Sequence, residues 1–280
     1  MSAGNSNHFA ALVRTERRGI ALFVTLDDPP TRNCMSQAMV AELTGVISTF
    51  AGDAARCVVL RGANGTFCSG GDISRFAADA ASEAPASGAD PIVVLNRSFG
   101  HLLEALDSAP QLIVSVVEGA AFGGGLGLVS ASDVVIAHTD ARFSLSETTL
   151  GLIPAQIAPF IVRRVGVPKA RWLALTGARI GGQAAAAHGL VDIVSNTTAN
   201  LDRAVMEVVN GVARCAPRAN AATRTLLAHA MSQPTGKTLD DAASRFADAL
   251  RDEGREGAAA FLGKRRPAWE PEKDETLAGE

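Results

Sequence analysis

Short continuous runs of apolar residues alternate with amphipathic segments along the first half of the chain. The continuous runs predict buried strands, and apolar positions that recur every three or four residues predict helices. The predicted strands are Ile20–Leu26, Cys57–Gly62, Leu112–Gly119 and Asp133–His138. One helix is predicted after Ser36, a suitable N-cap, and another over Leu95–Leu106. Strands and helices that alternate in this way indicate an α/β core with right-handed crossovers.

Two segments depart from this alternation. Residues Ala77–Pro91 are rich in alanine, serine and proline without periodicity, which predicts a mobile surface loop. After about Asn196 the strand signals cease, and helical patterns that begin with an apolar stripe from Leu201 continue to about Leu262. We therefore predict a core over residues 1–195 and a helical section over 196–280, whose apolar faces pack on the core or on another subunit.

Composition and charge exclude several classes of protein. The chain has 280 residues, a formal net charge of −3 and 47% hydrophobic residues, enough for one large core. Nucleic-acid binding is not expected, because it needs a basic face. No apolar run has the ~20 residues of a membrane span. The four cysteines lack metal-type spacing, so we expect reduced thiols in a cytoplasmic protein without a bound metal.

Two glycine-rich turns follow predicted strands and are the first candidates for chemistry. They are "GTFCSGGDI" after Cys57–Gly62 and "AAFGGGLGLV" after Leu112–Gly119. Such turns expose backbone N–H groups, and the first N–H groups of a helix have no partner within it. Two of these donors that meet at one point would form an oxyanion hole for an acyl oxygen that becomes enolate-like. Glycines that serve only tight packing or a bend are the alternative.

Other glycine-rich sites fit less well. A dinucleotide fingerprint would require a third glycine at Leu128, and no Gly-Lys-Ser/Thr of a phosphate-binding loop occurs. The basic cluster Lys264–Arg266 is either a solvated helix end or a phosphate contact.

Four motifs together resemble the crotonase superfamily of enoyl-CoA hydratases and isomerases. They are "GTFCSGGDI" (65–73), "EGAAFGGGLGLVSASDVVIA" (118–137), "FSLSETTLGLIP" (143–154) and "AAAHGLVDIV" (185–194), in the family's order and spacing. The resemblance implies an α/β fold, a crotonase-type ββα spiral core with a helical C-terminal section used in trimerisation. It also implies trimers, or paired trimers that form hexamers. The implied substrate is an acyl-CoA thioester, and no cofactor is implied beyond the coenzyme A of the substrate itself.

The resemblance also implies site residues. The oxyanion amides would be those of Gly71 and Gly124. The segment 69–74, with Ser69, Asp72 and Ile73, and the turn around Arg32 and Asn33 would line the bound coenzyme A. Phe261 and Lys264 resemble the family's contact to the nucleotide, which a neighbouring subunit often makes. From its place beside the turn, Asp72 is also a suitable cap for the next helix.

Two carboxylates usually act in the hydratases of this family, one as general base and one as general acid. The second matches Glu147. An alternative for Glu147 is a capping box with Ser144, in which it would only bind a backbone amide. The first carboxylate is absent, because its position is Gly127. Gly127 is one helical turn past Gly124, so we predict that the site loses a carboxylate and gains space.

With one carboxylate, either Glu147 alone activates water, or hydration is lost and the protein handles an acyl-CoA enolate in another way. The segment "SETTLGLIPAQIAPFIVRRVG" (146–166) resembles bacterial glutaconyl-CoA hydratases, including those for 3-methylglutaconyl- and isohexenylglutaconyl-CoA. This favours an enoyl-CoA hydratase-type lyase with Glu147 as base. A Δ3,Δ2-enoyl-CoA isomerase and a non-catalytic acyl-CoA-binding protein are the alternatives. Gln156 and Arg163 are within sequence reach of a second substrate carboxylate, but the sequence assigns no cation to it.

Overall fold

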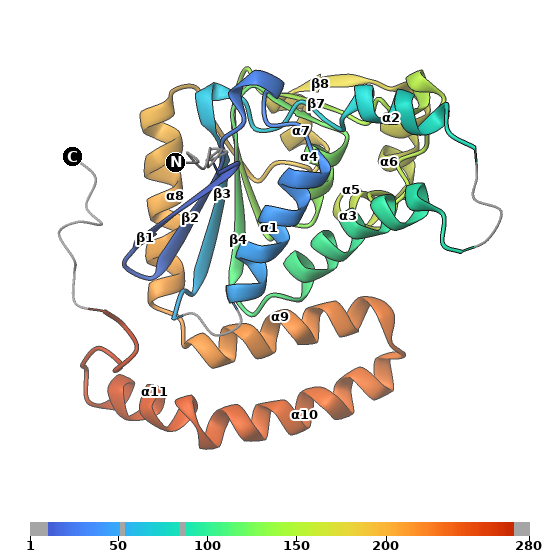
Figure 1. The fold of residues 1–280 in the computed structure, drawn as a ribbon. Coiled ribbons are helices and arrows are strands. Elements are labelled where there is room, and N and C mark those ends of the chain that lie inside the picture. Colours follow the sequence, from blue (N-terminus) through green and yellow to red (C-terminus); the bar gives the residue numbers. More distant parts are fainter. Residues whose placement is uncertain (1–10, 51–53, 84–87, 272–280) are drawn as a thin grey trace, which may run out of the picture.

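A six-stranded sheet forms the centre of the molecule (Figure 1). The computed structural model describes residues 11–50, 54–83 and 88–271. Neighbouring strands are parallel except at one edge, where β1 is antiparallel to β2. In their spatial order, the strands are β1 (Val13–Arg18), β2 (Ala21–Leu26), β3 (Cys57–Gly62), β4 (Leu112–Val117), β6 (Val134–His138) and β9 (Ile193–Ser195).

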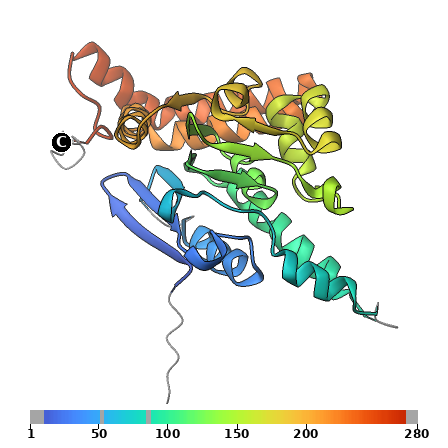
Figure 2. The same ribbon diagram turned by 90° about the horizontal axis from the view of Figure 1, so that it is seen from above.

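The sheet separates two hydrophobic cores. In β3, Val58 and Leu60 face the larger core, and Cys57 and Val59 face the smaller one, as the alternation of side chains along a strand requires. Helices α1 (Gln37–Thr49) and α3 (Pro91–Ser108) cover the first face. Helix α8 (Thr198–Ala213) covers the second, on the opposite side of the sheet from α1 (Figure 2).

A second, smaller layer carries the turns that matter for function. Its three-stranded sheet has the order β5-β7-β8, with β5 (Ala120–Phe122), β7 (Arg142–Ser144) and β8 (Arg179–Gly181). The surrounding helices are α2 (Ile73–Ala80), α4 (Gly124–Ser130), α5 (Ala158–Val165), α6 (Val167–Thr176) and α7 (Gly182–Ala187). Single turns of 3₁₀-helix lie at Pro29–Thr31, Ala63–Gly65 and Glu147–Leu150.

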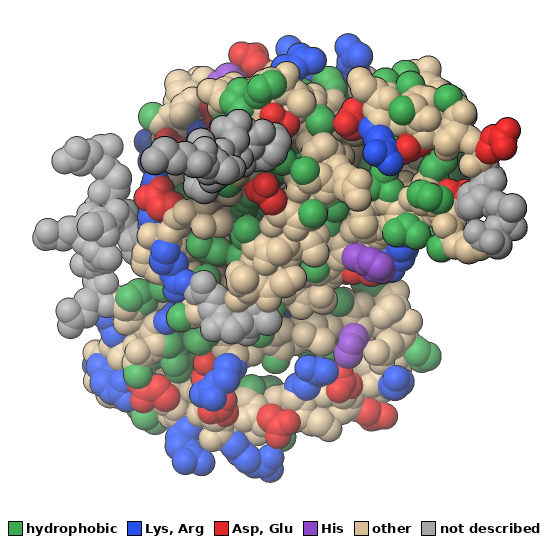
Figure 3. Space-filling model, in the orientation of Figure 1, with side chains coloured by type: hydrophobic (Ala, Val, Ile, Leu, Met, Phe, Trp, Pro, Cys, Tyr) green, Lys and Arg blue, Asp and Glu red, His purple; other side chains and the backbone are tan. Residues whose placement is uncertain are grey.

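Three C-terminal helices form an arm below the core in the view of Figure 1. They are α9 (Pro217–Ser232), α10 (Thr235–Arg251) and α11 (Glu253–Leu262). Arg224 joins α9 to the core: its guanidinium bonds Asp133 at 3.0 Å and the carbonyl oxygens of Leu106, Asp107 and Ala109. In Figure 3 the outer side of this arm carries mixed Lys, Arg, Asp and Glu side chains.

The predicted α/β class and its main elements are confirmed. Strand β3 has the predicted bounds, and the hydroxyl of Ser36 caps α1 by accepting the N–H of Met39 at 3.2 Å. The predicted loop over 77–91 is wrong at its start, because α2 continues to Ala80; residues 84–87 lie outside the described residues. The predicted division at 195/196 falls just before α8, a helix that packs against the sheet. No helix in the described ranges is long and apolar enough to cross a bilayer.

Candidate active site

The first glycine turn leaves β3 and runs beside the start of the second. The N–H of Cys68 donates to the carbonyl oxygen of Ala120 at 2.8 Å, and the N–H of Phe122 donates to that of Cys68 at 3.1 Å. Gly70 has a φ of +113°, a backbone conformation that other residues rarely adopt. The turn ends at Asp72, whose carboxylate accepts the N–H of Arg75 at 3.1 Å and caps α2, as predicted.

The second glycine turn leads from β5 into α4, and there is no room for side chains between the two turns. Gly123 has a φ of +45°, and a Cβ on it would lie 3.7 Å from the Cα of Gly70. A Cβ on Gly125 would lie 2.6 Å from the Cβ of Cys68. Gly125 therefore serves the close approach of the two backbone segments, and Gly123 provides the positive φ that the turn requires.

This approach brings Gly71 and Gly124 to the same cavity. Gly71 is paired with Met35 in an isolated bridge, and a Cβ on Gly124 would lie 2.8 Å from the Cγ of Met35. Gly124 is the first residue of α4, so its N–H has no partner within the helix. Outside helices and strands, no backbone acceptor is found in the described residues for the amide of Gly71 or that of Gly124, and both residues line the cavity.

Glu147 faces these turns from the start of its 3₁₀ turn. Its Oε1 lies 3.2 Å from the position that a Cβ on Gly123 would take. Its Oε2 is buried and has no hydrogen-bond partner among the described residues. The predicted alternative of a capping box is wrong, because the hydroxyl of Ser144 donates instead to the carbonyl oxygen of Gly177 at 3.2 Å. Burial in this apolar environment raises the pKa of Glu147 above its usual value.

The cavity that these groups line has a volume of about 640 Å³. Its wall is mainly apolar, and exposed side chains at its mouth, such as Ile73 on α2, Val93 on α3 and Ile153, extend the apolar surface outward. Figure 3 shows hydrophobic side chains over this part of the molecule, near the start of α3. Such a cavity is large enough for an acyl chain and would bury it away from water.

Polar side chains gather at one place in the cavity, and the sequence did not point to most of them. The side chain of Gln156 donates to Asn96 Oδ1 at 2.8 Å. The tips of Gln156 and Arg97 both lie over Gly100, whose missing side chain makes room for them. Arg97 also pairs with Glu104 at 2.7 Å. Arg163 does not line the cavity and pairs with Asp107 at 3.0 Å, whereas Arg97 and Arg75 both line it.

The space predicted beside Gly127 does not exist. A Cβ on Gly127 would lie 3.1 Å from the Cζ of Phe99 and 3.1 Å from the Cγ1 of Ile157. Gly127 is buried and does not line the cavity, whereas Phe99 and Ile157 do. The prediction failed because these two side chains come from α3 and from the residue before α5, where nothing in the sequence near Gly127 reveals them. The site has lost a carboxylate and gained an aromatic wall.

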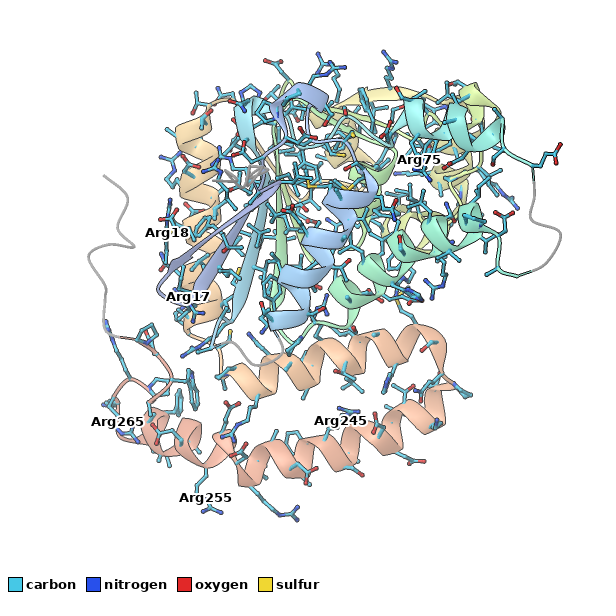
Figure 4. All side chains as sticks on the ribbon, viewed as in Figure 1. Arg17, Arg18, Arg75, Arg245, Arg255 and Arg265 are labelled. Atoms are coloured by element: carbon cyan, nitrogen blue, oxygen red, sulfur yellow. The ribbon has the colours of Figure 1, made fainter. Side chains whose placement is uncertain are left out.

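The structure brings only part of the expected coenzyme A contacts together. Ser69, Asp72 and Ile73 line the cavity. Arg32 is next to them, because its carbonyl oxygen accepts the N–H of Ser69 at 3.0 Å. In Figure 4, Arg75 marks the cavity side of the molecule on α2, and Arg265 lies far away at the end of the C-terminal arm.

Phe261 and Lys264 are placed with Arg265 in this arm and do not line the cavity of the same chain. The ring of Phe261 is 84% exposed, and Lys264 has a φ of +52° just after α11 ends.

Comparisons with known proteins show the family to which the chain is related. A family model described as enoyl-CoA hydratase/isomerase matches residues 15–272. The enoyl-CoA hydratase ACTT6 of Alternaria alternata is 31% identical over 88% of this chain and 80% of its own length. A probable enoyl-CoA hydratase of Bacillus subtilis is 31% identical over 89% of this chain and 95% of its own.

Solved structures give the same result. Pseudomonas aeruginosa AtuE superposes with a TM-score of 0.88 at 48% identity, over 93% of this chain and all of its own. An enoyl-CoA hydratase/isomerase from Marinobacter aquaeolei has a TM-score of 0.89 at 42% identity, over 93% and 99% of the two chains.

Proposed function

Since this chain belongs to the enoyl-CoA hydratase/isomerase family, we propose that its cavity adds water to an α,β-unsaturated acyl-CoA, with Glu147 as the base. The family and its hydratase relatives make the chain an enzyme of the enoyl-CoA hydratase type. The observation that carries the proposal is the buried, unpartnered Oε2 of Glu147 beside the two glycine turns. A buried polar atom without a partner is costly, which favours a role in chemistry.

The amides of Gly71 and Gly124 would hold the thioester oxygen. As water adds to C3 of the double bond, negative charge moves onto this oxygen, and fixed N–H donors stabilise that charge without reorganising. Loss of one such donor costs about 2.7–4 kcal/mol of transition-state stabilisation. The backbone supplies both donors, so no side-chain substitution removes them directly.

Glu147 would move both protons. Its carboxylate accepts a proton from the water as the oxygen attacks C3, and the enolate then takes a proton from the same carboxyl group at C2. The sum is H and OH added across one double bond, and the enzyme returns to its starting state. Burial raises the pKa of Glu147, which brings the group nearer to the neutral pH at which it must both accept and release a proton.

The other carboxylates of the cavity are already engaged. Asp72 caps α2, and Asp79 pairs with Arg75 at 2.8 Å. Among the described residues that line the cavity, Glu147 is thus the one carboxylate without a structural partner. This supports the single-carboxylate mechanism.

We propose a branched glutaconyl-CoA, such as 3-methylglutaconyl- or isohexenylglutaconyl-CoA, as the substrate. The long apolar wall suits a hydrocarbon branch, and Arg97 with Asn96 and Gln156 offers hydrogen-bond donors to a second carboxylate. Hydration of crotonyl-, 3-methylglutaconyl- and isohexenylglutaconyl-CoA, with Glu147→Gln as control, tests this. Faster hydration of crotonyl-CoA than of either glutaconyl-CoA would contradict the substrate proposal.

A Δ3,Δ2-enoyl-CoA isomerase is the second candidate, because one carboxylate suffices to move a proton from C2 to C4. Turnover of a 3-enoyl-CoA without net addition of water would favour it. A non-catalytic acyl-CoA-binding protein would bind both classes and show no turnover that depends on Glu147.

We also propose that the protein is a cytoplasmic homotrimer or hexamer. Apolar side chains are exposed along the C-terminal arm: Leu227, Met231, Leu239, Phe246, Leu250, Phe261 and Leu262. Their burial between subunits would place Phe261 and Lys264 near the nucleotide end of a neighbour's coenzyme A. Light scattering of the purified protein measures the assembly, and a monomer at micromolar concentration would contradict it.

A further inference from the structure

Phe99 is the side chain that shapes the cavity next to the proposed thioester position. It extends from the middle of α3, is half-buried, and lies across two glycines of α4. Its Cζ is 3.5 Å from the Cβ position of Gly124 and 3.1 Å from that of Gly127. The ring therefore contacts the helix that supplies one of the two proposed oxyanion amides.

The position of the ring determines which acyl carbon it meets. If Gly124 binds the thioester oxygen, the carbon atom C2 lies one bond from the thioester carbon, close to the side chains that surround Gly124. These include Phe99 and Met35, whose Cγ is 2.8 Å from the Cβ position of Gly124. A hydrogen on C2 fits between two such side chains, but a methyl group there would need space that the ring fills.

A substituent on C3 has a different environment. The cavity extends from the glycine turns toward its apolar mouth, where Val93 and Ile153 are exposed. A branch on C3 can therefore extend outward along this surface without displacing Phe99.

We infer that Phe99 is a specificity-determining residue that excludes enoyl-CoAs with a substituent on C2 while accepting those branched at C3. This rests on the proposed function, since the acyl-CoA and its thioester position come from it. Phe99 acts by shape alone: it has no proton to transfer, and Glu147 remains the acid and base. The ring closes the side of the cavity on which Gly127 lies.

The test compares substrates and non-reacting analogues that differ by one methyl group. Tiglyl-CoA carries a 2-methyl group that crotonyl-CoA lacks, and 2-methylbutyryl-CoA and butyryl-CoA form the matching saturated pair. We compare kcat/KM for tiglyl-CoA with that for crotonyl-CoA, and the affinity for 2-methylbutyryl-CoA with that for butyryl-CoA. In Phe99→Ala and the milder Phe99→Leu, both ratios should rise by roughly tenfold, which is the lower end of the discrimination that one methylene gives in an apolar pocket. The matched control is Phe160→Leu, a buried phenylalanine of α5 that does not line the cavity.

The affinities for the saturated analogues, measured by calorimetry, distinguish failure of the proposed function from failure of the inference about Phe99. If wild-type protein binds both saturated analogues but hydrates neither these two enoyl-CoAs nor 3-methylglutaconyl-CoA, the proposed function is wrong, and the affinity ratio alone decides the role of Phe99. If the wild-type protein hydrates crotonyl-CoA and both Phe99 variants keep the wild-type ratios within twofold, the inference about Phe99 is wrong. An equal shift in Phe160→Leu also overturns it, because a general loosening of the core would then explain the change.

Discussion

Restoring the missing carboxylate at position 127 should fail while Phe99 is present. The first methylene of a Gly127→Glu side chain would lie 3.1 Å from both Phe99 and Ile157, so one of these must move. Overpacking of this kind costs about 1–3 kcal/mol, and a helical Gly→Ala change returns about 1 kcal/mol. The carboxylate adds about 3–5 kcal/mol when it is buried without a partner. We therefore expect Gly127→Glu to lower the free energy of unfolding by about 3–7 kcal/mol.

A double-mutant cycle identifies the cause. Phe99→Ala removes the ring and opens a path from position 127 to the water in the cavity. Gly127→Glu should then cost less in the Phe99→Ala background than in the wild type, with a coupling energy of at least about 1 kcal/mol. Guanidinium chloride denaturation of the wild type, the two single variants and the double variant measures the coupling energy. Gly127→Ala adds a methyl group without a charge, so its loss of stability, about 0–2 kcal/mol, measures the steric cost alone. Two effects that add within about 0.5 kcal/mol would refute the reasoning, because the ring would then not occupy the space of the carboxylate.

Three further changes test the proposed base, its support and the attachment of the arm. Glu147→Gln should lower kcat by about 10²–10⁴-fold, and wild-type kcat/KM should fall on acidification at a higher pH than an ordinary glutamate gives. Because burial raises the folded-state pKa of Glu147, the stability that this group contributes is complete at acid pH and is lost as the pH rises through that pKa. Glu147→Gln should therefore be more stable than wild type at pH 7 and lose this advantage at acid pH, in thermal melts across pH. Gly123→Ala places a methyl group 3.2 Å from Glu147 Oε1 at a φ of +45° and should lower kcat at least tenfold in steady-state assays, with Gly45→Ala as the control in open space. Arg224→Met leaves Asp133 without its cation and should cost about 3 kcal/mol in guanidinium chloride denaturation; an unchanged midpoint would show that the arm is held by other contacts.

The sequence predicted those strands whose residues are buried on both faces. Strand β3 is covered on both sides, so its residues form one apolar run that has the same bounds in the sequence and in the structure. Strand β1 was missed because it lies at the sheet edge, where five of its six residues, "RTERR", are exposed. Strands β5, β7 and β8 have three residues each, too few to show a period.

Site prediction depended on how far apart in the chain the contacting residues lie. Glu147 and the glycine turns could be found because each lies in a local motif that resembles the crotonase family. The polar group of Asn96, Arg97 and Gln156 combines α3 with a loop some 60 residues later, and no local pattern links them. Its only local sign is Gly100, a glycine inside a helix, whose role is clear once the two side chains above it are seen.

The absence of a second carboxylate and the presence of Phe99 are best understood as one structural feature. Even a Cβ at position 127 would lie 3.1 Å from this ring, so any side chain there requires the ring or Ile157 to shift, and a glutamate requires more. A change at either position alone would therefore cost stability without restoring a two-carboxylate site. With Gly127 and Phe99 at these positions, the site has one proton-transfer group fewer and an apolar wall next to the proposed position of C2. In the proposed mechanism a single group serves both proton transfers of a turnover, so the pKa of Glu147 matters more than in a site with two carboxylates. Burial raises that pKa, and Phe99, which occupies the space next to position 127, lines the same mainly apolar cavity as Glu147.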